Sequence, residues 1–426
     1  MDELYHKRIV DSELANRLRS IGAIVIEGPK WCGKSTTAEH HSKSAIFMDN
    51  PQKRAQYEIF AEDNPDILLD GETPRLIDEW QLTPTLWDAI RFRIDHKKGM
   101  GQFILTGSAK PADRSKIKHS GTGRFAWLRM RPMSLYESGD STGAVSLTQL
   151  FTDSETKIAA ESKADLYKIA FLACRGGWPA VTSMSDDIAM NPSKDYYDAI
   201  VNVDIREVDG VDRSVERAKR LMRSYARFQG TQASVKQIID DMNGAGNNVM
   251  EDKTVRNYLD ALRSMFVIED TPAWNPNLKS KTAIRSADTH YFVDPSVATA
   301  ALGIGPGDLI NDLKTFGFIF ETMCIRDLRV YSQPLGGNVY HYRDKNGLEC
   351  DAVIHLPNGD YGLVEIKLGG ERLIEDGAQS LLKLSEKIDD TRMKMPKFMM
   401  VITAAGAFAY RRKDNVLVVP LTTLGA

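Results

Sequence analysis

Residues 28–35 read Gly-Pro-Lys-Trp-Cys-Gly-Lys-Ser, and they decide the fold of the first part of this 426-residue chain. An apolar run at 21–26 precedes them and a helical stretch follows, so we expect a strand, a glycine-bounded loop and a helix in succession. The glycines let backbone N–H groups turn toward phosphate, and the helix N-terminus adds its positive end. Lys34 is expected to reach the β- and γ-phosphates, and the Ser35 hydroxyl to bind Mg²⁺. The sequence therefore predicts a site for ATP and Mg²⁺, formed here by Gly28, Gly33, Lys34, Ser35 and Thr36.

A second motif, PRLIDEW at residues 74–80, is a short apolar run that ends in two acids. In this arrangement Asp78 points at the Mg²⁺ shell and Glu79 polarises the attacking water. An ordinary strand end would look the same. Its position after the P-loop, a second strand at 45–48 and a helical stretch suits alternating β/α units, which favours the ATPase interpretation.

Two further segments hold candidate residues for the same site. The strand at 102–106 is followed by Gly107 and Ser108, and either Thr106 or Ser108 is expected to sense the γ-phosphate. Arg124 follows a glycine-rich turn and is predicted to stabilise transition-state charge, either in its own chain or across a subunit interface. The simpler alternatives are a strand that stops at Gly107 and a surface arginine.

Composition limits the class of protein. Hydrophobic residues make up 42% and charged residues 27%, as in globular proteins, and no apolar run approaches the roughly 18 residues that span a bilayer. The N-terminus lacks the apolar core of a signal peptide, and the four cysteines form no metal-ligand spacing, so we expect a cytoplasmic protein without a membrane partner. A net charge of −3 gives no overall attraction to nucleic acid, so any DNA binding must come from local patches.

The middle of the chain is predicted to be helical from about 145 to 228, and its last part is strongly basic. The basic side chains are Arg213, Arg217, Lys219, Arg220, Arg223 and Arg227. Such a run is either a solvated helix face or a surface that contacts phosphate, and we assign Arg217 and Arg220 to DNA contact.

Two helices at 234–242 and 252–263, followed by strands at 266–274 and 289–293, predict a winged-helix module. Its second helix would enter a DNA major groove with Lys253, Arg256 and Asn257, and a basic loop between the strands would add Lys281. The alternative is that the module contacts protein.

The last part of the chain carries a third pattern. A helix with Glu321 precedes two strands joined by an Asn-Gly turn, and a third strand follows. Asp351 lies on the second strand, and the Glu365-x-Lys367 pair lies on the third, which is adjacent to it. Glu365 and Lys367 share one strand face. The two carboxylates would bind Mg²⁺ while Lys367 holds the attacking water, as in metal-dependent nucleases. A solvated pair of charges would give the same spacing, but the charges of 363–368 alternate with apolar residues, which indicates a purpose for them.

The ordered set GPKWCGKST, RLIDEWQ, FILTGSA, GTGR and the Gly-Gly-Trp-Pro turn at 176–179, with the C-terminal acids, resembles a family of bacterial and archaeal ATP-binding proteins. The resemblance covers nearly the whole chain. It implies an α/β fold with an AAA-like ATPase domain, a winged helix and a C-terminal domain of the PD-(D/E)XK nuclease type whose function is unknown. In that family Lys34, Asp78, Glu79 and Arg124 match the nucleotide site, and Glu321 resembles an accessory acid.

Together these features predict four parts: an ATPase domain at 1–145, a helical lid or linker at 146–228, a winged helix at 229–303 and a nuclease-like domain at 304–426. The expected function is an Mg²⁺-dependent ATPase that couples nucleotide state to DNA binding, with a possible nuclease site at Asp351, Glu365 and Lys367. Self-association through Arg124 would complete the ATPase. The alternative is a nucleotide-dependent switch that binds protein partners.

Overall fold

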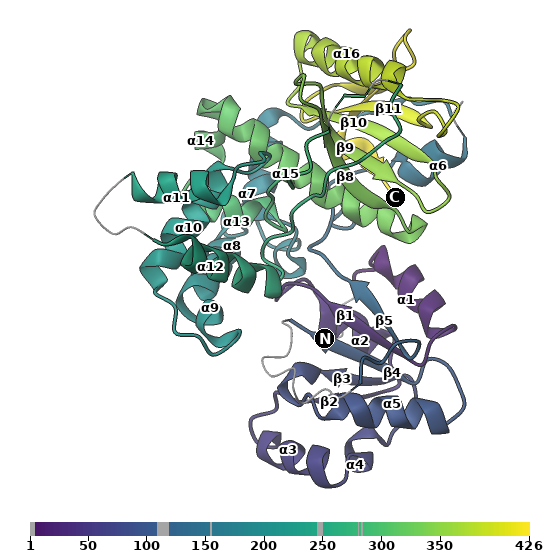
Figure 1. Ribbon diagram of the computed structural model, residues 1–426, viewed down its shortest axis with the longest axis vertical. Coiled ribbons are helices and arrows are strands. Elements are labelled where there is room, and N and C mark those ends of the chain that lie inside the picture. Colours follow the sequence, from purple (N-terminus) through teal and green to yellow (C-terminus); the bar gives the residue numbers. More distant parts are fainter. Residues whose placement is uncertain (1–4, 109–118, 154–155, 245–249, 280, 283) are drawn as a thin grey trace. The chain divides into compact units, whose positions relative to one another are not determined.

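The computed structural model describes residues 5–108, 119–153, 156–244, 250–279, 281–282 and 284–426 (Figure 1). The chain forms two compact units. The first contains residues 1–132, 202–213 and 259–267, and the second contains 133–201, 214–258 and 268–426. Within the described residues, no helix has the length and apolar character needed to cross a membrane.

The first unit is built on a five-stranded parallel sheet with the strand order β2-β3-β4-β1-β5. Its strands are β1 (Ala23–Glu27), β2 (Ser44–Phe47), β3 (Arg75–Asp78), β4 (Phe103–Gly107) and β5 (Phe125–Arg129). Its helices are α1 (Val10–Leu18), α2 (Lys34–His40), α3 (Arg54–Asp63), α4 (Asp66–Leu69), the 3-10 turn η1 (Trp80–Leu82), α5 (Leu86–His96) and the short α9 (Ile205–Glu207). This is the alternating β/α order that the sequence predicts.

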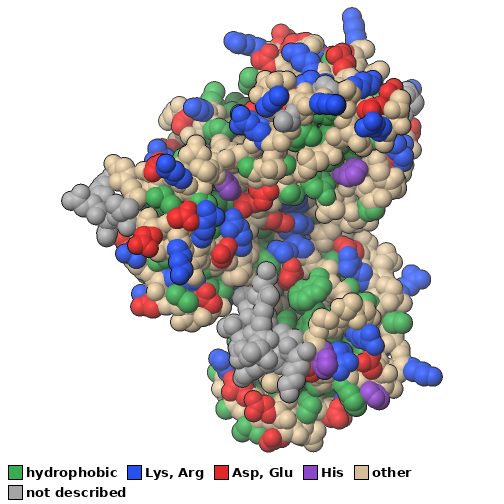
Figure 2. Space-filling view, in the orientation of Figure 1, with side chains coloured by type: hydrophobic (Ala, Val, Ile, Leu, Met, Phe, Trp, Pro, Cys, Tyr) green, Lys and Arg blue, Asp and Glu red, His purple; other side chains and the backbone are tan. Residues whose placement is uncertain are grey.

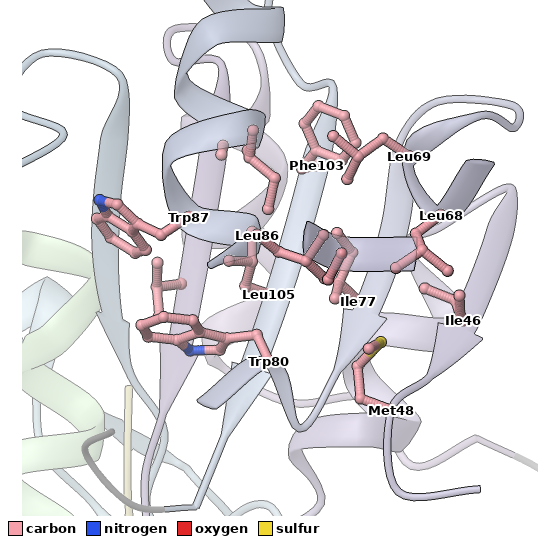
Figure 3. Close-up of a cluster of buried hydrophobic side chains, with 14 of the residues drawn as sticks. Ile46, Met48, Leu68, Leu69, Ile77, Trp80, Leu86, Trp87, Phe103 and Leu105 are labelled. Atoms are coloured by element: carbon pink, nitrogen blue, oxygen red, sulfur yellow. The ribbon is translucent and has the colours of Figure 1, made fainter. Parts of the chain in front are cut away.

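The two faces of this sheet are covered by different helices because side chains of a strand alternate in direction. In β1, Ala23 and Val25 join a cluster with residues of α4 and α5, which Figure 3 draws around Trp80 and Trp87. The alternate residues of β1, Ile24 and Ile26, pack against α1 and α2 in a second cluster. Both layers are apolar, and the sheet therefore presents its polar groups at the ends of its strands.

The second unit contains a seven-stranded mixed sheet with the order β7-β12-β13-β11-β10-β9-β8. Its strands are β7 (Ala160–Glu161), β8 (Asn338–Arg343), β9 (Glu349–His355), β10 (Tyr361–Lys367), β11 (Phe398–Thr403), β12 (Phe408–Arg411) and β13 (Leu417–Pro420). Helix α16 (Glu371–Lys387) covers one face, and α15 (Leu313–Ser332) lies on the other side of the sheet (Figure 1). The predicted helix, hairpin and third strand of this region are therefore present.

The second unit contains further helices and short helical turns. They are α6 (Leu147–Thr152), α7 (Leu166–Arg175), η3 (Pro179–Val181), α8 (Asn191–Ala199), α10 (Val215–Arg227), α11 (Val235–Asn243), α13 (Pro295–Leu302), α14 (Pro306–Asn311), η5 (Gln333–Leu335) and η6 (Leu421–Thr423). The π-helical turn η4 (Ile200–Asp204) and α12 (Asp252–Ser264) run across the division between the units. The buried Asp294, which precedes α13, accepts hydrogen bonds from the Gly177 N–H and the Arg326 guanidinium, at 3.0 and 2.8 Å. The Gly-Gly-Trp-Pro turn is thus held by α13 and α15.

The predicted domain boundaries differ from this division. We expected the ATPase domain to reach residue 145 and a helical lid to follow, but the second unit already begins at Met133. The reason is that the connecting segment supplies strands: β7 pairs with β12 at the edge of the large sheet, and β6 (Val145–Ser146) pairs with β14 (Leu424–Gly425). Strands of two residues carry too little pattern to be recognised in the sequence.

Candidate nucleotide-binding and acidic sites

The P-loop lies at the carboxyl end of β1 and leads into α2, which begins at Lys34. Gly33 has a positive φ of 94°, which favours glycine, and a Cβ on Gly28 would lie 2.1 Å from the Met130 carbonyl oxygen. The Lys34 side chain is buried and its ammonium donates to the Pro29 carbonyl at 2.8 Å. The ammonium is therefore held over the loop that is expected to bind phosphate.

Asp78, the last residue of β3, accepts hydrogen bonds from two hydroxyl groups. Ser35 Oγ donates to Asp78 Oδ1 at 2.7 Å, and Thr106 Oγ1 donates to the same oxygen. The three side chains come from the first turn of α2 and the carboxyl ends of β3 and β4, which meet at one edge of the sheet. Hydroxyl and carboxylate oxygens are the ligands that Mg²⁺ prefers, so the residues present fit this ion.

Glu79 follows Asp78 in the left-handed region, with φ 53° and ψ 43°. Its Oε2 accepts hydrogen bonds from the Gln81 amide and, at 3.2 Å, from Ser108 Oγ. Ser108 thus contacts the acid that is expected to polarise water, and its role as a phosphate sensor stays a prediction. Thr36 is exposed on the first turn of α2.

Arg8 supports the P-loop, although no motif marks it in the sequence. Its buried guanidinium donates to the carbonyl of Cys32 within the loop at 2.8 Å and to the carbonyl of Arg131 at 2.9 Å. The segment before α1 thereby fastens the loop to the chain that follows β5. This is a long-range contact between backbone acceptors and one arginine, and sequence spacing gives no signal for it.

Arg124 does not lie at the nucleotide site of its own chain, so the prediction of a role in cis is wrong. It precedes β5, whose first residue pairs with Ala23 at the amino end of β1, while the P-loop follows the carboxyl end. Five residues of strand separate these edges by roughly 16 Å. Arg124 instead forms an ion pair with Asp95 at 2.7 Å. A role across a subunit interface stays a prediction.

Arg129, the last residue of β5, is the arginine that lies at the carboxyl edge of the sheet, where Arg124 was expected. Its guanidinium contacts the Glu27 carboxylate at 2.6 Å, directly before the P-loop, and lies 4.2 Å above the centre of the Phe266 ring. The sequence gives no glycine turn or motif at this position, and only the pairing register of β5 with β1 reveals it.

The basic run in the middle of the chain divides into side chains that bind neighbouring residues and side chains that do not. Arg213 precedes α10 and is buried in an ion pair with Asp209 at 2.6 Å. Arg220 donates to the Met242 carbonyl, and Arg227 pairs with Asp241 at 2.9 Å. These three residues therefore serve local packing. Arg217 and Arg223 are exposed and Lys219 is half-buried, and within the described chain no acid or carbonyl group binds their side chains.

The exposed face of α12 carries the residues predicted to read DNA, namely Lys253, Arg256 and Asn257. Arg256 pairs with Asp252, and Arg263 pairs with Asp260 at 3.2 Å. Figure 2 shows the same mixture, with Lys and Arg among Asp and Glu over α10 and α12. The face is therefore of mixed charge rather than uniformly basic.

The expected basic wing is reduced to two isolated antiparallel bridges, Ile268↔Phe292 and Thr271↔Thr289. The loop between them follows the edge of the large sheet instead of projecting. The Trp274 N–H donates to the His341 carbonyl at 2.7 Å, and the Trp274 ring belongs to the core under α16. Lys281 is exposed on this loop. The apolar Trp274 explains the difference, because its burial fixes the loop to the sheet.

The C-terminal charges meet as predicted at the adjacent ends of β9 and β10. The Lys367 ammonium lies 2.6 Å from Glu365 Oε2 and 3.3 Å from Asp351 Oδ2. Asp351 Oδ2 also accepts the Ile366 N–H at 2.7 Å. Gly377 of α16 lies over this group, and a Cβ there would approach Glu365 Cβ to 3.3 Å. The result is one ammonium between two carboxylates beneath a helix.

Glu321 of α15 lies close enough to Asp351 and Lys367 to interact with both charges. The buried Tyr291 hydroxyl donates to its Oε1, and burial followed by the Asp351 carboxylate raises the pKa of Glu321 to about 8. Across the described residues, no three His, Cys, Asp or Glu side chains are placed to hold a metal ion, so Glu321, Asp351 and Glu365 do not form the expected set.

Known proteins resemble the chain at two levels. An uncharacterized protein of Mycobacterium tuberculosis (Rv2008c) and one of Mycobacterium bovis (Mb2031c) are each 22% identical over 423 residues, which is 98% of this chain and 84% of the relative. Among solved structures, the Walker-type ATPase PABY2304 of Pyrococcus abyssi has a TM-score of 0.41 at 13% identity, over 70% of this chain and 96% of that chain. The ORC2 protein of Aeropyrum pernix has a TM-score of 0.35 at 13% identity, over 74% and 97%.

Three family models match successive parts of the chain. A Domain of unknown function (DUF8612) covers residues 167–308, and another (DUF4143) covers 316–424. The AAA domain family covers residues 20–139, which contain the P-loop, Asp78 and Glu79. Residues 20–139 are therefore similar to AAA domains.

Proposed function

We propose that the chain binds ATP with Mg²⁺ at the P-loop and hydrolyses it. The observation that carries this proposal is the convergence of Ser35, Asp78 and Thr106 in one hydrogen-bonded group beside Lys34. Mg²⁺, when bound, neutralises phosphate charge during transfer. Lys34 contributes a buried positive charge for the β- and γ-phosphates, and the backbone N–H groups before α2 donate hydrogen bonds to the phosphate oxygens.

Glu79 is the residue proposed to orient the attacking water. It lies at the same edge as Asp78, one residue farther along the chain, and its carboxylate is already held by two hydrogen bonds. A carboxylate fixed in this way needs little reorganisation when water approaches, which favours the reaction.

We further propose that nucleotide state controls DNA binding through the helical region. Support comes from Arg217, Lys219 and Arg223, which present positive charge on one helix, and from the exposed polar side chains of α12. Phosphate contact by such side chains gives sequence-independent, salt-dependent binding. The mixed charge of α12 favours the alternative, in which this surface binds a protein partner and the nucleotide acts as a switch.

The C-terminal group suggests a second activity, cleavage of a phosphodiester. Its support is the placement of Lys367 between Asp351 and Glu365, which brings a proton donor within reach of two potential cation ligands. The two carboxylates fit a divalent ion in chemistry, and a bound ion would polarise the phosphodiester. Lys367 would have to leave one carboxylate to make room for the ion and would then be free to hold the attacking water.

One experiment tests these proposals together. ATP turnover is measured for the wild type, K34A and E79Q in Mg²⁺, with and without supercoiled DNA, and the DNA is then separated on a gel. We expect turnover that both substitutions abolish and that DNA increases. Turnover in K34A equal to the wild type would refute the ATPase proposal.

The same gel separates the remaining possibilities. Nicking that is lost in D351N and retained in D390N, a change at an exposed acid, would support the nuclease. Intact DNA that nevertheless stimulates turnover would reduce the C-terminal group to a structural or binding role. DNA that changes neither turnover nor mobility would favour the partner-binding switch.

A further inference from the structure

Gln81 in η1 has an amide oxygen for which the described residues supply no hydrogen-bond partner, although the oxygen is buried. The orientation of the amide is fixed by chemistry, because its other end faces the Glu79 carboxylate, which accepts hydrogen bonds only. The nitrogen must therefore face Glu79 and the oxygen must point away from it. A buried acceptor without a donor is unfavourable for folding, and its persistence calls for an explanation.

The direction of this oxygen is given by Gly107. A Cβ at Gly107 would lie 2.7 Å from Gln81 Oε1 and 3.2 Å from the Trp80 indole nitrogen. Gly107 ends β4 and pairs with Glu27, the residue directly before the P-loop. The amide oxygen therefore lies at the carboxyl edge of the sheet between β3 and β4, on the side where the phosphates of a nucleotide are expected.

The backbone of Glu79 adds a second, independent observation. A non-glycine residue with φ 53° is in a sparsely populated conformation, and such residues gather at functional sites where the surroundings hold them. This conformation turns the chain so that Glu79 and Gln81 present their side chains together. The pair offers one carboxylate and one amide oxygen as neighbouring acceptors.

We propose that Gln81 is a catalytic residue of the ATPase proposed above, on which this inference rests. Its amide oxygen accepts one hydrogen of the attacking water while the Glu79 carboxylate accepts the other, and its amide nitrogen holds Glu79 in place. The water oxygen then forms a bond to the γ-phosphorus as the bond to the bridging oxygen breaks and ADP leaves with the electron pair. One water proton passes to Glu79 and is released to phosphate or solvent.

The test compares Q81M with Q102M. Gln102 is a matched control because its amide oxygen is also buried without a partner in the described chain, but it precedes β4 at the amino edge, opposite the P-loop. Phosphate release in Mg²⁺ gives kcat and KM, and a fluorescent ADP analogue gives nucleotide affinity. Loss of a hydrogen bond to a reacting group predicts a fall in kcat of about 10- to 100-fold for Q81M, with KM and ADP affinity unchanged. Q102M is expected to keep kcat within about twofold of the wild type.

G107A serves as a second variant if Q81M folds poorly. The added methyl group would press on the amide oxygen without removing Gln81, and a similar loss in kcat is expected. A Q81M enzyme with wild-type kcat beside an inactive E79Q would overturn the role of Gln81 and leave the ATPase intact. Equal losses in Q81M and Q102M, with lower melting temperatures, would assign Gln81 to packing. Wild-type phosphate release no faster than that of K34A would overturn both the ATPase and this role.

Discussion

Replacing Lys367 by methionine would remove the single positive charge between Asp351 and Glu365. Methionine keeps most of the side-chain length, so the main change is electrostatic. Burial alone would lower the pKa of Lys367, but the Asp351 and Glu365 carboxylates outweigh it and raise that pKa, so the ammonium stays charged in the native protein. Glu365 is 3% exposed, and the substitution leaves its carboxylate buried next to Asp351.

The expected cost follows from this burial. Removing one partner of a buried ion pair destabilises a protein by about 3 to 5 kcal/mol, and we expect this loss for K367M at pH 8. Burial, and then Asp351, raises the pKa of Glu365 well above its usual range, and losing the lysine raises it further. An acid whose pKa is raised on folding is stabilising below its unfolded pKa, and this contribution is lost as the pH rises through the folded pKa. The cost of K367M should therefore be smaller at pH 5 than at pH 8, by about 1 to 2 kcal/mol.

Urea unfolding at pH 5 and pH 8, with hydrogen exchange of the β10 peptide to locate the change, measures this cost. K279M is the control, because Lys279 and Asp390 form an exposed pair at 3.5 Å that should contribute less than about 1 kcal/mol. Equal losses in K367M and K279M, or a loss for K367M that does not change with pH, would refute an ionised buried pair.

Three further predictions concern other parts of the chain. R326M should reduce the free energy of unfolding by about 3 kcal/mol or more, because it leaves the buried Asp294 carboxylate without its ion-pair partner. Circular dichroism against temperature checks this as a lower melting temperature. T106V removes the hydroxyl that donates a hydrogen bond to Asp78 and should reduce Mg²⁺-dependent turnover about 3- to 10-fold in the phosphate-release assay. The affinity for ADP without Mg²⁺ should be unchanged. R223A should weaken DNA binding and reduce its salt dependence by about one unit of slope, measured by fluorescence anisotropy from low to moderate salt.

Local sequence was sufficient where the site is built from adjacent residues. The loop at 28–35 and the acids of β3 are short contiguous motifs, and the strand-loop-helix order around them determines where Lys34 and Ser35 lie. The spacing of Glu365 and Lys367 likewise determined a shared strand face, and the antiparallel pairing of β9 with β10 places Asp351 beside them.

Sequence was insufficient where the outcome depends on strand order or on distant backbone groups. The glycine turn before Arg124 suggested a functional arginine, but only the pairing of β5 with β1 reveals that this end of the strand is the wrong edge. Arg220 looks like its exposed neighbours in the sequence, yet a carbonyl on α11 captures it. The basic loop after Trp274 has the composition of a wing, and one buried indole ring decided its course.

The strands β6 and β7 have a practical consequence for dissecting this protein. A fragment that begins near residue 304 would remove the partner of β12 and leave the edge of the large sheet with unsatisfied backbone groups. It would also leave β14 without its partner β6, and the Leu424 carbonyl would lose the hydrogen bond that the Ser141 hydroxyl donates to it. Expression of the C-terminal part should therefore include the segment from Met133, and fragments cut at the family-match boundaries are expected to aggregate.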